Sequence, residues 1–135
     1  MHKHLPEMKA ATGIDFPPVF NPIVADFYSG MVVTTPIHKR FLKKQISTKD
    51  IWQMFKEYYG GHSMVEIMPF GEELKENFIA SNSLSENNKI QIFIYGNEER
   101  FCITTRYDNL GKGASGAAVQ CMNIMLGIEE NYSIV

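Results

Sequence analysis

The sequence predicts an α+β fold built on a largely antiparallel mixed sheet with helices. Two strand-like segments on either side of one turn alternate apolar and polar residues, which is typical of a β-hairpin. Other segments repeat apolar residues at helical spacing and end at glycine. Strands and helices do not alternate strictly along the chain, and this favours an α+β layer over a parallel sheet.

The first half of the chain begins with a predicted helix over residues 4–12, which Gly13 stops. Extended segments follow at residues 19–25 and 31–37, and the second is rich in β-branched residues. Ser47 then predicts the start of a helix, because an acidic residue three positions later completes a capping box. That helix ends at the glycine pair 60–61 and carries one apolar stripe, formed by Ile51, Trp52, Phe55, Tyr58 and Tyr59.

The second half contains the hairpin. A short strand is predicted at residues 64–68, and a polar loop follows over 71–88, with a strand edge near Phe78 as an option. The hairpin pairs residues 89–95 with residues 100–107, and it places Ile90, Ile92 and Ile94 on one face. The last predicted helix covers residues 113–126 and is apolar nearly all round. Such a helix is expected to dock onto a structure that this chain does not contain.

Composition narrows the functional class. The chain has 135 residues, 44% of them hydrophobic, which predicts one globular domain over residues 1–135. A net charge of -2 argues against a nucleic-acid partner, and no signal peptide or membrane span is predicted. The basic cluster at residues 38–44 is interpreted as a solvated connection, with an anion patch as the alternative. Cys102 and Cys121 are expected to be buried and reduced, which fits a cytoplasmic protein.

Gly111-x-Gly113-x-x-Gly116 spells the dinucleotide-binding fingerprint between a strand-like and a helix-like segment. A complete Rossmann unit would need a second parallel strand with an acidic residue, and only a short polar tail follows the helix. The glycines are therefore expected to form a tight helix start instead of a complete nucleotide site. The loop from Asn109 to Gly113 suits an anion or an amide, and a glycine turn that permits close helix packing is an equal alternative.

Two further groups of residues could carry chemistry. His2, His4 and Glu7 could exchange protons or ligate zinc, although their local sequence favours a frayed, exposed chain end. No metal site is predicted, because a fourth ligand is not evident. Ser81 and Asn82 are a candidate polar anchor for a ligand, although local evidence favours ordinary loop chemistry. The local sequence around each cysteine shows no nucleophile setting.

Taken together, four segments resemble the C-terminal portion of the N-acetyl-gamma-glutamyl-phosphate reductase family. The first is His2-Lys-His-Leu-Pro-Glu7, which is similar to the family's His-Arg-His-x-Pro-Glu run. The others are Phe20-Asn-Pro22 leading to Gly30-Met31, then Ala80-Ser-Asn82, and finally the closing run at residues 108–123, which begins Asp-Asn-Leu-Gly-Lys-Gly-Ala-Ser-Gly. Their order and approximate spacing hold over essentially the whole chain.

The resemblance implies a function and an architecture. Such enzymes reduce an acyl phosphate with NADPH through a thioester on a cysteine, in arginine biosynthesis. They pair a Rossmann domain with an α+β domain like the C-terminal domain of glyceraldehyde-3-phosphate dehydrogenase. By similarity, His2 and His4 would be the acid–base partners of the thiolate, with His4 slightly favoured and Glu7 assisting. The residues expected near the nicotinamide are Asn109, Gly111 and Gly113, and those near the substrate are Ser81 and Asn82.

The resemblance also has gaps. The Rossmann domain and the nucleophile segment are not within residues 1–135, so this chain is expected to be an inactive fragment by itself. It is expected to form a homodimer or tetramer, with the isoleucine face of the hairpin presented to a second copy. Where the family commonly has Pro-His and later Arg-Gly, this chain has Pro22-Ile23 and Ser29-Gly30. If that arginine holds the substrate's phosphate or carboxylate, the substrate contact of this chain is reassigned or weaker.

Two alternatives stay open at this stage. One is a binding or dimerisation module of the same fold without catalysis. The other is a reductase of a related acyl phosphate, from aspartyl phosphate or from the lysine pathway. The sequence leaves undecided which histidine acts and whether NADPH or NADH is preferred, because the residues that bind the ribose lie elsewhere.

Overall fold

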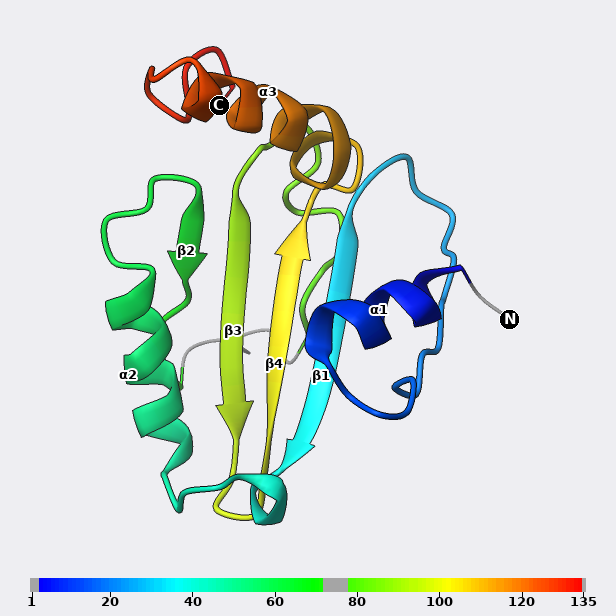
Figure 1. The fold of residues 1–135 in the computed structure, drawn as a ribbon, viewed down its shortest axis with the longest axis vertical. Coiled ribbons are helices and arrows are strands. Elements are labelled where there is room, and N and C mark those ends of the chain that lie inside the picture. Colours follow the sequence, from blue (N-terminus) through cyan, green and yellow to red (C-terminus); the bar gives the residue numbers. More distant parts are fainter. Residues whose placement is uncertain (1–2, 72–77, 135) are drawn as a thin grey trace.

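A computed structural model describes residues 3–71 and 78–134, which form a four-stranded mixed sheet (Figure 1). The strand order is β1-β4-β3-β2. β1 and β3 both pair antiparallel with β4, and β2 is parallel to β3. This architecture confirms the predicted α+β class. The strands are β1 (Met31–His38), β2 (Val65–Ile67), β3 (Ile90–Gly96) and β4 (Arg100–Tyr107). β1 forms one edge of this sheet and includes Pro36, which pairs with Cys102.

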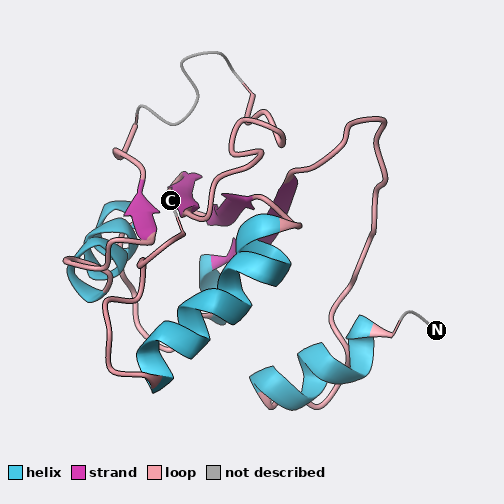
Figure 2. Cartoon of the chain, turned by 90° about the horizontal axis from the view of Figure 1, so that it is seen from above, coloured by secondary structure: helices cyan, strands magenta, loops and turns pink. Residues whose placement is uncertain are grey.

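Three helices surround the sheet, namely α1 (His4–Thr12), α2 (Thr48–Tyr58) and α3 (Gly116–Met125). The two views show α1 and α2 on one side of the sheet and α3 across one end of it (Figures 1 and 2). The bounds of α1 are those predicted, and Gly13 closes the helix with a left-handed φ of 68°. In the described ranges, no helix has both the length and the apolar character needed to cross a membrane.

The core lies between α2 and the sheet. Ile92 and Ile94 on β3 are 5% and 1% exposed, and they cluster with Ile51 of α2 and Phe101 of β4. Three residues of the predicted stripe, Trp52, Phe55 and Tyr59, pack against this cluster, whereas Tyr58 is exposed. The expectation that the isoleucine face would be presented to a second copy is therefore wrong, because α2 already covers it.

The start of α2 is capped as the sequence predicts. The Ser47 hydroxyl accepts a hydrogen bond from the Asp50 amide at 3.0 Å, and the Asp50 carboxylate accepts one from the Ser47 amide at 3.0 Å. Hydrogen bonds from the side chain and the amide of Ser47 hold the pKa of Asp50 below its usual value. The helix therefore begins where its first amides find acceptors.

The last helix differs from its prediction. The segment predicted as one helix begins with a π-helical turn, η2 (Gly111–Ser115), and only then becomes α3. The Ser115 amide donates to the Leu110 carbonyl five residues earlier, at 3.1 Å. Because this longer spacing replaces the usual four-residue step, the regular helix starts later than predicted. The option of a strand edge near Phe78 is also wrong, since Phe78 lies in a bend and is 61% exposed.

α3 buries the polar Asn123 and exposes several of its apolar side chains. Asn123 is 1% exposed and donates to the carbonyls of Glu130 and Tyr132, at 3.1 and 2.9 Å, in the tail that folds back beside the helix. The expectation that Cys121 is buried is wrong, because its side of α3 faces outward, whereas Cys102 is half-buried; both are free thiols. The exposed apolar side chains of this region are Met122, Ile124, Met125 and Leu126.

A buried carboxylate ties the end of β4 to two distant segments. Asp108 is 3% exposed and accepts hydrogen bonds from the Ser29 hydroxyl at 3.2 Å and from the amides of Glu86 and Leu110 at 2.6 and 2.8 Å. Burial alone would raise the pKa of Asp108. Hydrogen bonds from the amides of Leu110, Glu86 and Gly111 and from Ser29 outweigh that effect and hold the pKa below its usual value. The carboxylate is therefore ionised in the folded chain at neutral pH.

Removal of the Ser47 side chain tests the capping box at the start of α2. Replacement of Ser47 by alanine leaves the Asp50 amide without its acceptor, and we expect it to lower the free energy of unfolding by about 1 kcal/mol. Urea denaturation monitored by circular dichroism measures the change. Lys49→Ala, at an exposed position of the same turn, is the control and should lie within about 0.5 kcal/mol of the parent. Equal stabilities of the Ser47→Ala variant and this control would contradict the capping assignment.

The Asp108 carboxylate predicts a pH dependence of stability. A carboxyl group whose pKa is lowered by folding stabilises the folded state above its unfolded pKa, near 3.8, and this contribution is lost as the pH falls through the lower folded value. Asp108→Asn should lower the free energy of unfolding at pH 7 by about 3 kcal/mol, because buried donors lose a charged acceptor.

Urea denaturation between pH 2 and about pH 6 tests this expectation. The difference between parent and Asp108→Asn should shrink as the pH falls below 4, since protonation then removes the charge from the parent as well. Asp50 and Glu130, whose pKa values are also lowered, leave a residual slope in both proteins. A difference that stays constant over this range would contradict an ionised Asp108.

Candidate functional site at the start of the last helix

Three segments that are far apart in the sequence meet where β4 ends. The Asn109 side-chain oxygen accepts a hydrogen bond from the Gly30 amide at 2.8 Å, and the Ser85 hydroxyl donates to the Ser29 carbonyl at 2.8 Å. Gly30 has a φ of 123°, and a Cβ atom at this residue would lie 2.3 Å from the Ser81 carbonyl oxygen. Only glycine allows this close approach. The structure therefore brings Ser81 and the first residues after β4 to the same junction.

The glycines of the fingerprint have a packing role in this junction. A Cβ atom on Gly116 would lie 1.8 Å from the Asn88 side-chain oxygen, and one on Gly113 would lie 3.2 Å from the Tyr107 ring. A Cβ atom on Gly111 would lie 3.1 Å from the Asn88 side-chain oxygen. These contacts support the alternative of a glycine turn that permits close helix packing. The expected approach of Asn109, Gly111 and Gly113 to a cofactor stays a prediction.

Arg106 connects the sheet to the candidate substrate segment. Its guanidinium donates to the Gln91 side-chain oxygen through Nε and Nη2, at 3.0 and 2.6 Å, and to the Ala80 carbonyl through Nη1, at 3.2 Å. It also lies over the Phe93 ring, with 5.2 Å from Cζ to the ring centre. Burial lowers the pKa of Arg106, although the group stays protonated. Ala80 directly precedes Ser81 and Asn82, so Arg106 contacts the segment from the sheet side.

The histidine group lies apart from this junction. α1 is on the same side of the sheet as α2, whereas the chain from residue 78 runs behind the sheet in Figure 1, and Figure 2 agrees. The His4 ring meets the edge of Phe20, with 6.1 Å between ring centres, and α1 buries none of its residues. Glu7 is exposed on α1, and His2 lies outside the described residues. The structure therefore does not bring His4 or Glu7 to Ser81 and Asn82.

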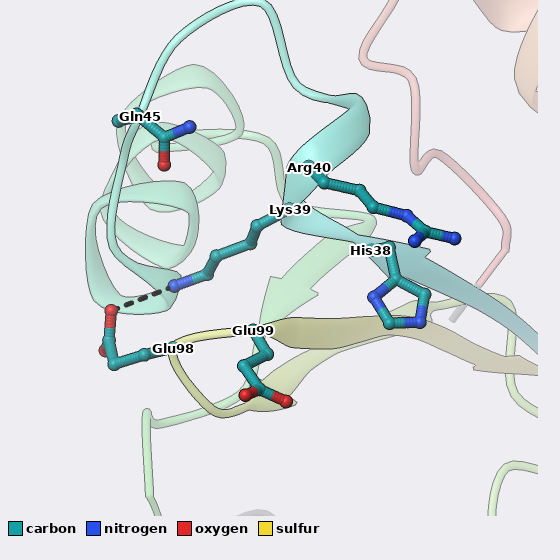
Figure 3. A pocket seen from close by; sticks show the side chains of 6 residues that line it. All are labelled: His38, Lys39, Arg40, Gln45, Glu98 and Glu99. Carbon is teal, nitrogen blue, oxygen red and sulfur yellow. Dashed lines mark hydrogen bonds and ion pairs between the residues drawn. The ribbon is translucent and has the colours of Figure 1, made fainter.

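A groove of about 350 Å³ lies at the opposite end of the sheet, beside the turn of the β3–β4 hairpin (Figure 3). The buried Lys39 forms an ion pair with the exposed Glu98, with 3.2 Å between Nζ and Oε2. Figure 3 shows that Arg40 points away from this pair, and Arg40 stacks over Phe41 at 4.8 Å. Lys39 and Arg40 of the predicted basic cluster therefore do not converge, which favours the connection over the anion patch. The groove is lined by His38, Lys39, Arg40, Gln45, Glu98 and Glu99.

Within residues 3–71 and 78–134, no three side chains of His, Cys, Asp or Glu gather closely enough to hold a metal ion. The zinc alternative for the N-terminal histidines involves His2, which is outside these ranges.

Sequence reasoning missed the residues that assemble the junction. The local sequence could have indicated Asp108. An aspartate after a strand commonly accepts a hydrogen bond from the amide two residues later, as Asp108 does from Leu110. Ser29 and Glu86 had no such local signal, since they lie 79 and 22 residues away from Asp108. Arg106 was counted as a strand residue, and its contact with Ala80 spans 26 residues.

Comparison with known proteins agrees with this fold. Residues 1–109 match the family described as semialdehyde dehydrogenase, dimerisation domain. The chain is 39% identical over 138 aligned positions to N-acetyl-gamma-glutamyl-phosphate reductase 2 of Nostoc sp. and 38% identical to the reductase of Trichormus variabilis; each alignment covers 98% of this chain and 43% of the relative. The Brucella ovis reductase is 37% identical over 93% of this chain and 41% of its own length.

The chain thus spans about two fifths of the length of the curated relatives it matches. These relatives are reductases, and the match of the family extends over α1, all four strands and the Asp108 junction. The chain therefore belongs to the semialdehyde dehydrogenase dimerisation-domain family.

Proposed function

We propose that this chain is the C-terminal part of a reductase that converts N-acetyl-gamma-glutamyl phosphate to N-acetylglutamate semialdehyde in arginine biosynthesis. The observation that carries the proposal is the identity of 39% to a reductase of that name over 98% of this chain. The relatives are more than twice as long as the part aligned here. A nucleotide-binding domain and the catalytic cysteine are accordingly proposed to lie in the remainder of the enzyme, in the cytoplasm, and this chain alone is proposed to be inactive.

In this reaction class, a cysteine thiolate displaces phosphate from the acyl group, and the resulting thioester is then reduced. NADPH, as the proposed cofactor, supplies the hydride. An imidazole near the sulfur can accept the thiol proton and return it when the thiolate leaves. We assign this role to His4 or His2, with Glu7 assisting, on the family resemblance. This assignment rests on the resemblance alone, because the structure does not bring His4 or Glu7 to Ser81 and Asn82.

The junction after β4 is proposed to face the substrate and the nicotinamide. Ser81 and Asn82 would contact the substrate, and Asn109, Gly111 and Gly113 would lie near the cofactor. The hydrogen bond between Asn109 and Gly30 and the close contact of Gly30 with Ser81 support this assignment, because they join the two groups in one place. Preorganised backbone of this kind is the usual requirement for positioning reactants.

The outward apolar side of α3 is proposed to pack against the nucleotide-binding domain. Met125 and Leu126 are 87% and 66% exposed, while the polar Asn123 on the same helix is buried. Exposed apolar surface of this kind marks an interaction site. The family description supports assembly into homo-oligomers, and we propose a dimer or a tetramer of the complete enzyme.

A related acyl phosphate is the second candidate substrate, because this chain has Ser29 where the resemblance implies an arginine. The family commonly has arginine at this place, whereas Ser29 is 3% exposed and donates its hydroxyl to Asp108. The Ser29 hydroxyl is therefore already engaged within the protein. Substrate profiling of the complete enzyme with N-acetylglutamyl, aspartyl and lysine-pathway acyl phosphates separates these candidates, and a complete enzyme that binds but reduces none of them would indicate a non-catalytic module.

Restoration of activity tests the proposed function. This chain, assembled with the nucleotide-binding portion of its enzyme, should reduce the acyl phosphate, whereas the chain alone should not. His4→Ala and His2→Ala, made separately, should leave KM nearly unchanged, and at least one should lower kcat about 100-fold or more, the size expected of an acid–base group. His62→Ala, an exposed histidine outside the motif, is the control. Full activity of both motif variants would remove the acid–base assignment.

Introduction of a charge on the exposed apolar side of α3 tests the proposed contact with the nucleotide-binding domain. Met125→Glu should leave the unfolding temperature of this chain within about 2 °C of the parent, because the side chain is already exposed. The same change should weaken binding to the separately produced nucleotide-binding portion about tenfold or more, since it removes apolar burial and buries a charge. Isothermal titration calorimetry measures the affinity. Lys49→Glu on α2 is the matched control, and equal affinities of the two variants would contradict the proposed interface.

A further inference from the structure

The Arg106 side chain on β4 contacts both the neighbouring strand β3 and the loop at Ala80. It is paired with Gln91 across β3 and β4, and residues 91 and 93 point to the sheet face opposite the core isoleucines. Two of its nitrogens converge on the Gln91 oxygen and a third reaches the Ala80 carbonyl. The planar guanidinium cannot rotate one of these donors without moving the others. Its direction toward Ala80 is therefore set from the sheet.

The Gln91 side chain is itself oriented by a carboxylate. Its amide nitrogen donates to the Glu66 carboxylate on β2 at 2.8 Å. Because an ionised carboxylate only accepts hydrogen bonds, Glu66 binds the nitrogen end of the Gln91 amide and leaves the oxygen end for Arg106. A chain of hydrogen bonds thus runs across the sheet from Glu66 through Gln91 and Arg106 to the Ala80 carbonyl.

This arrangement holds a positive charge in a partly buried place. Burial lowers the pKa of Arg106, and Glu66 partly offsets that effect. Among the described residues, no carboxylate is in ion-pair contact with the guanidinium, and its acceptors are an amide and a carbonyl oxygen. A neutral side chain could cover Phe93 without this cost. The charge strengthens the contact with the loop at Ala80, because a charge-assisted hydrogen bond to a carbonyl is stronger than a neutral one.

We propose that Arg106 is a positioning residue that holds the segment Ala80–Asn82 in its place through its forked contact with Gln91 and Ala80. The segment is then fixed from two sides, by Arg106 at the Ala80 carbonyl and by the backbone of Gly30 against Ser81. This inference rests on the proposed function in one respect: Ser81 and Asn82 contact the acyl phosphate. Arg106 then acts on substrate binding without touching the substrate.

Hydrogen–deuterium exchange of this chain tests the positioning directly. In Arg106→Gln, peptides that cover Ala80–Asn82 should exchange about tenfold faster than in the parent, because the loop loses a charged hydrogen bond. Arg106→Lys, which keeps the charge and the fold, should also exchange several-fold faster, since one ammonium group lacks the fork needed to reach both acceptors. Arg100→Gln, on the same strand but exposed, is the matched control. Exchange at the parent rate in both Arg106 variants, or in Arg106→Lys alone, overturns the inference.

Kinetics of the complete enzyme test the consequence for the substrate. Arg106→Lys should raise KM for the acyl phosphate about tenfold while kcat and KM for NADPH change less than about twofold, because only the substrate segment is displaced. Faster exchange with an unchanged KM for the acyl phosphate overturns the link to substrate binding. If the parent enzyme reduces no acyl phosphate at all, the proposed function fails, and the exchange experiment still decides whether Arg106 holds the loop.

Discussion

The Asp108 carboxylate is the interaction on which the rest of the junction depends. It is nearly inaccessible to solvent, yet it remains charged because donors from three separate segments surround it. Loss of any one donor leaves a buried charge less well compensated, which costs more than an ordinary surface hydrogen bond. The position of Ser29, the turn at Glu86 and the path into the π-helical turn are thereby coupled. A disturbance in one segment must displace the other two.

The junction also explains why α3 starts as it does. The chain leaves β4 at Asp108 and passes Asn109, which holds Gly30, and it then reaches the glycines that contact Asn88 and Tyr107. The π-helical turn lengthens the first helical turn, and such turns are frequent at functional sites. The glycines are needed there for space, which is a sufficient reason for the fingerprint without a bound nucleotide.

Local patterns predicted most of the fold, and long-range contacts limited the rest. The hairpin and the capped helix follow from alternation and from the Ser47–Asp50 spacing, and both are confirmed. The prediction that a second copy covers the isoleucine face was wrong. An apolar stripe in the sequence does not reveal which surface it packs against. The polarity of α3 was also unpredictable, since the burial of Asn123 depends on a tail that folds back to it. Family resemblance named Ser81 and Asn109, but the contact between their segments depends on Gly30.

The edge of the sheet at β1 has a consequence for assembly. A strand edge displays backbone donors and acceptors to which another extended chain can add. Pro36 has no amide hydrogen to offer and interrupts that display near the end of β1. Another extended chain that pairs with this edge therefore lacks one backbone hydrogen-bond donor. The protein can therefore have an exposed edge strand and still disfavour the repeated strand addition that leads to fibrils.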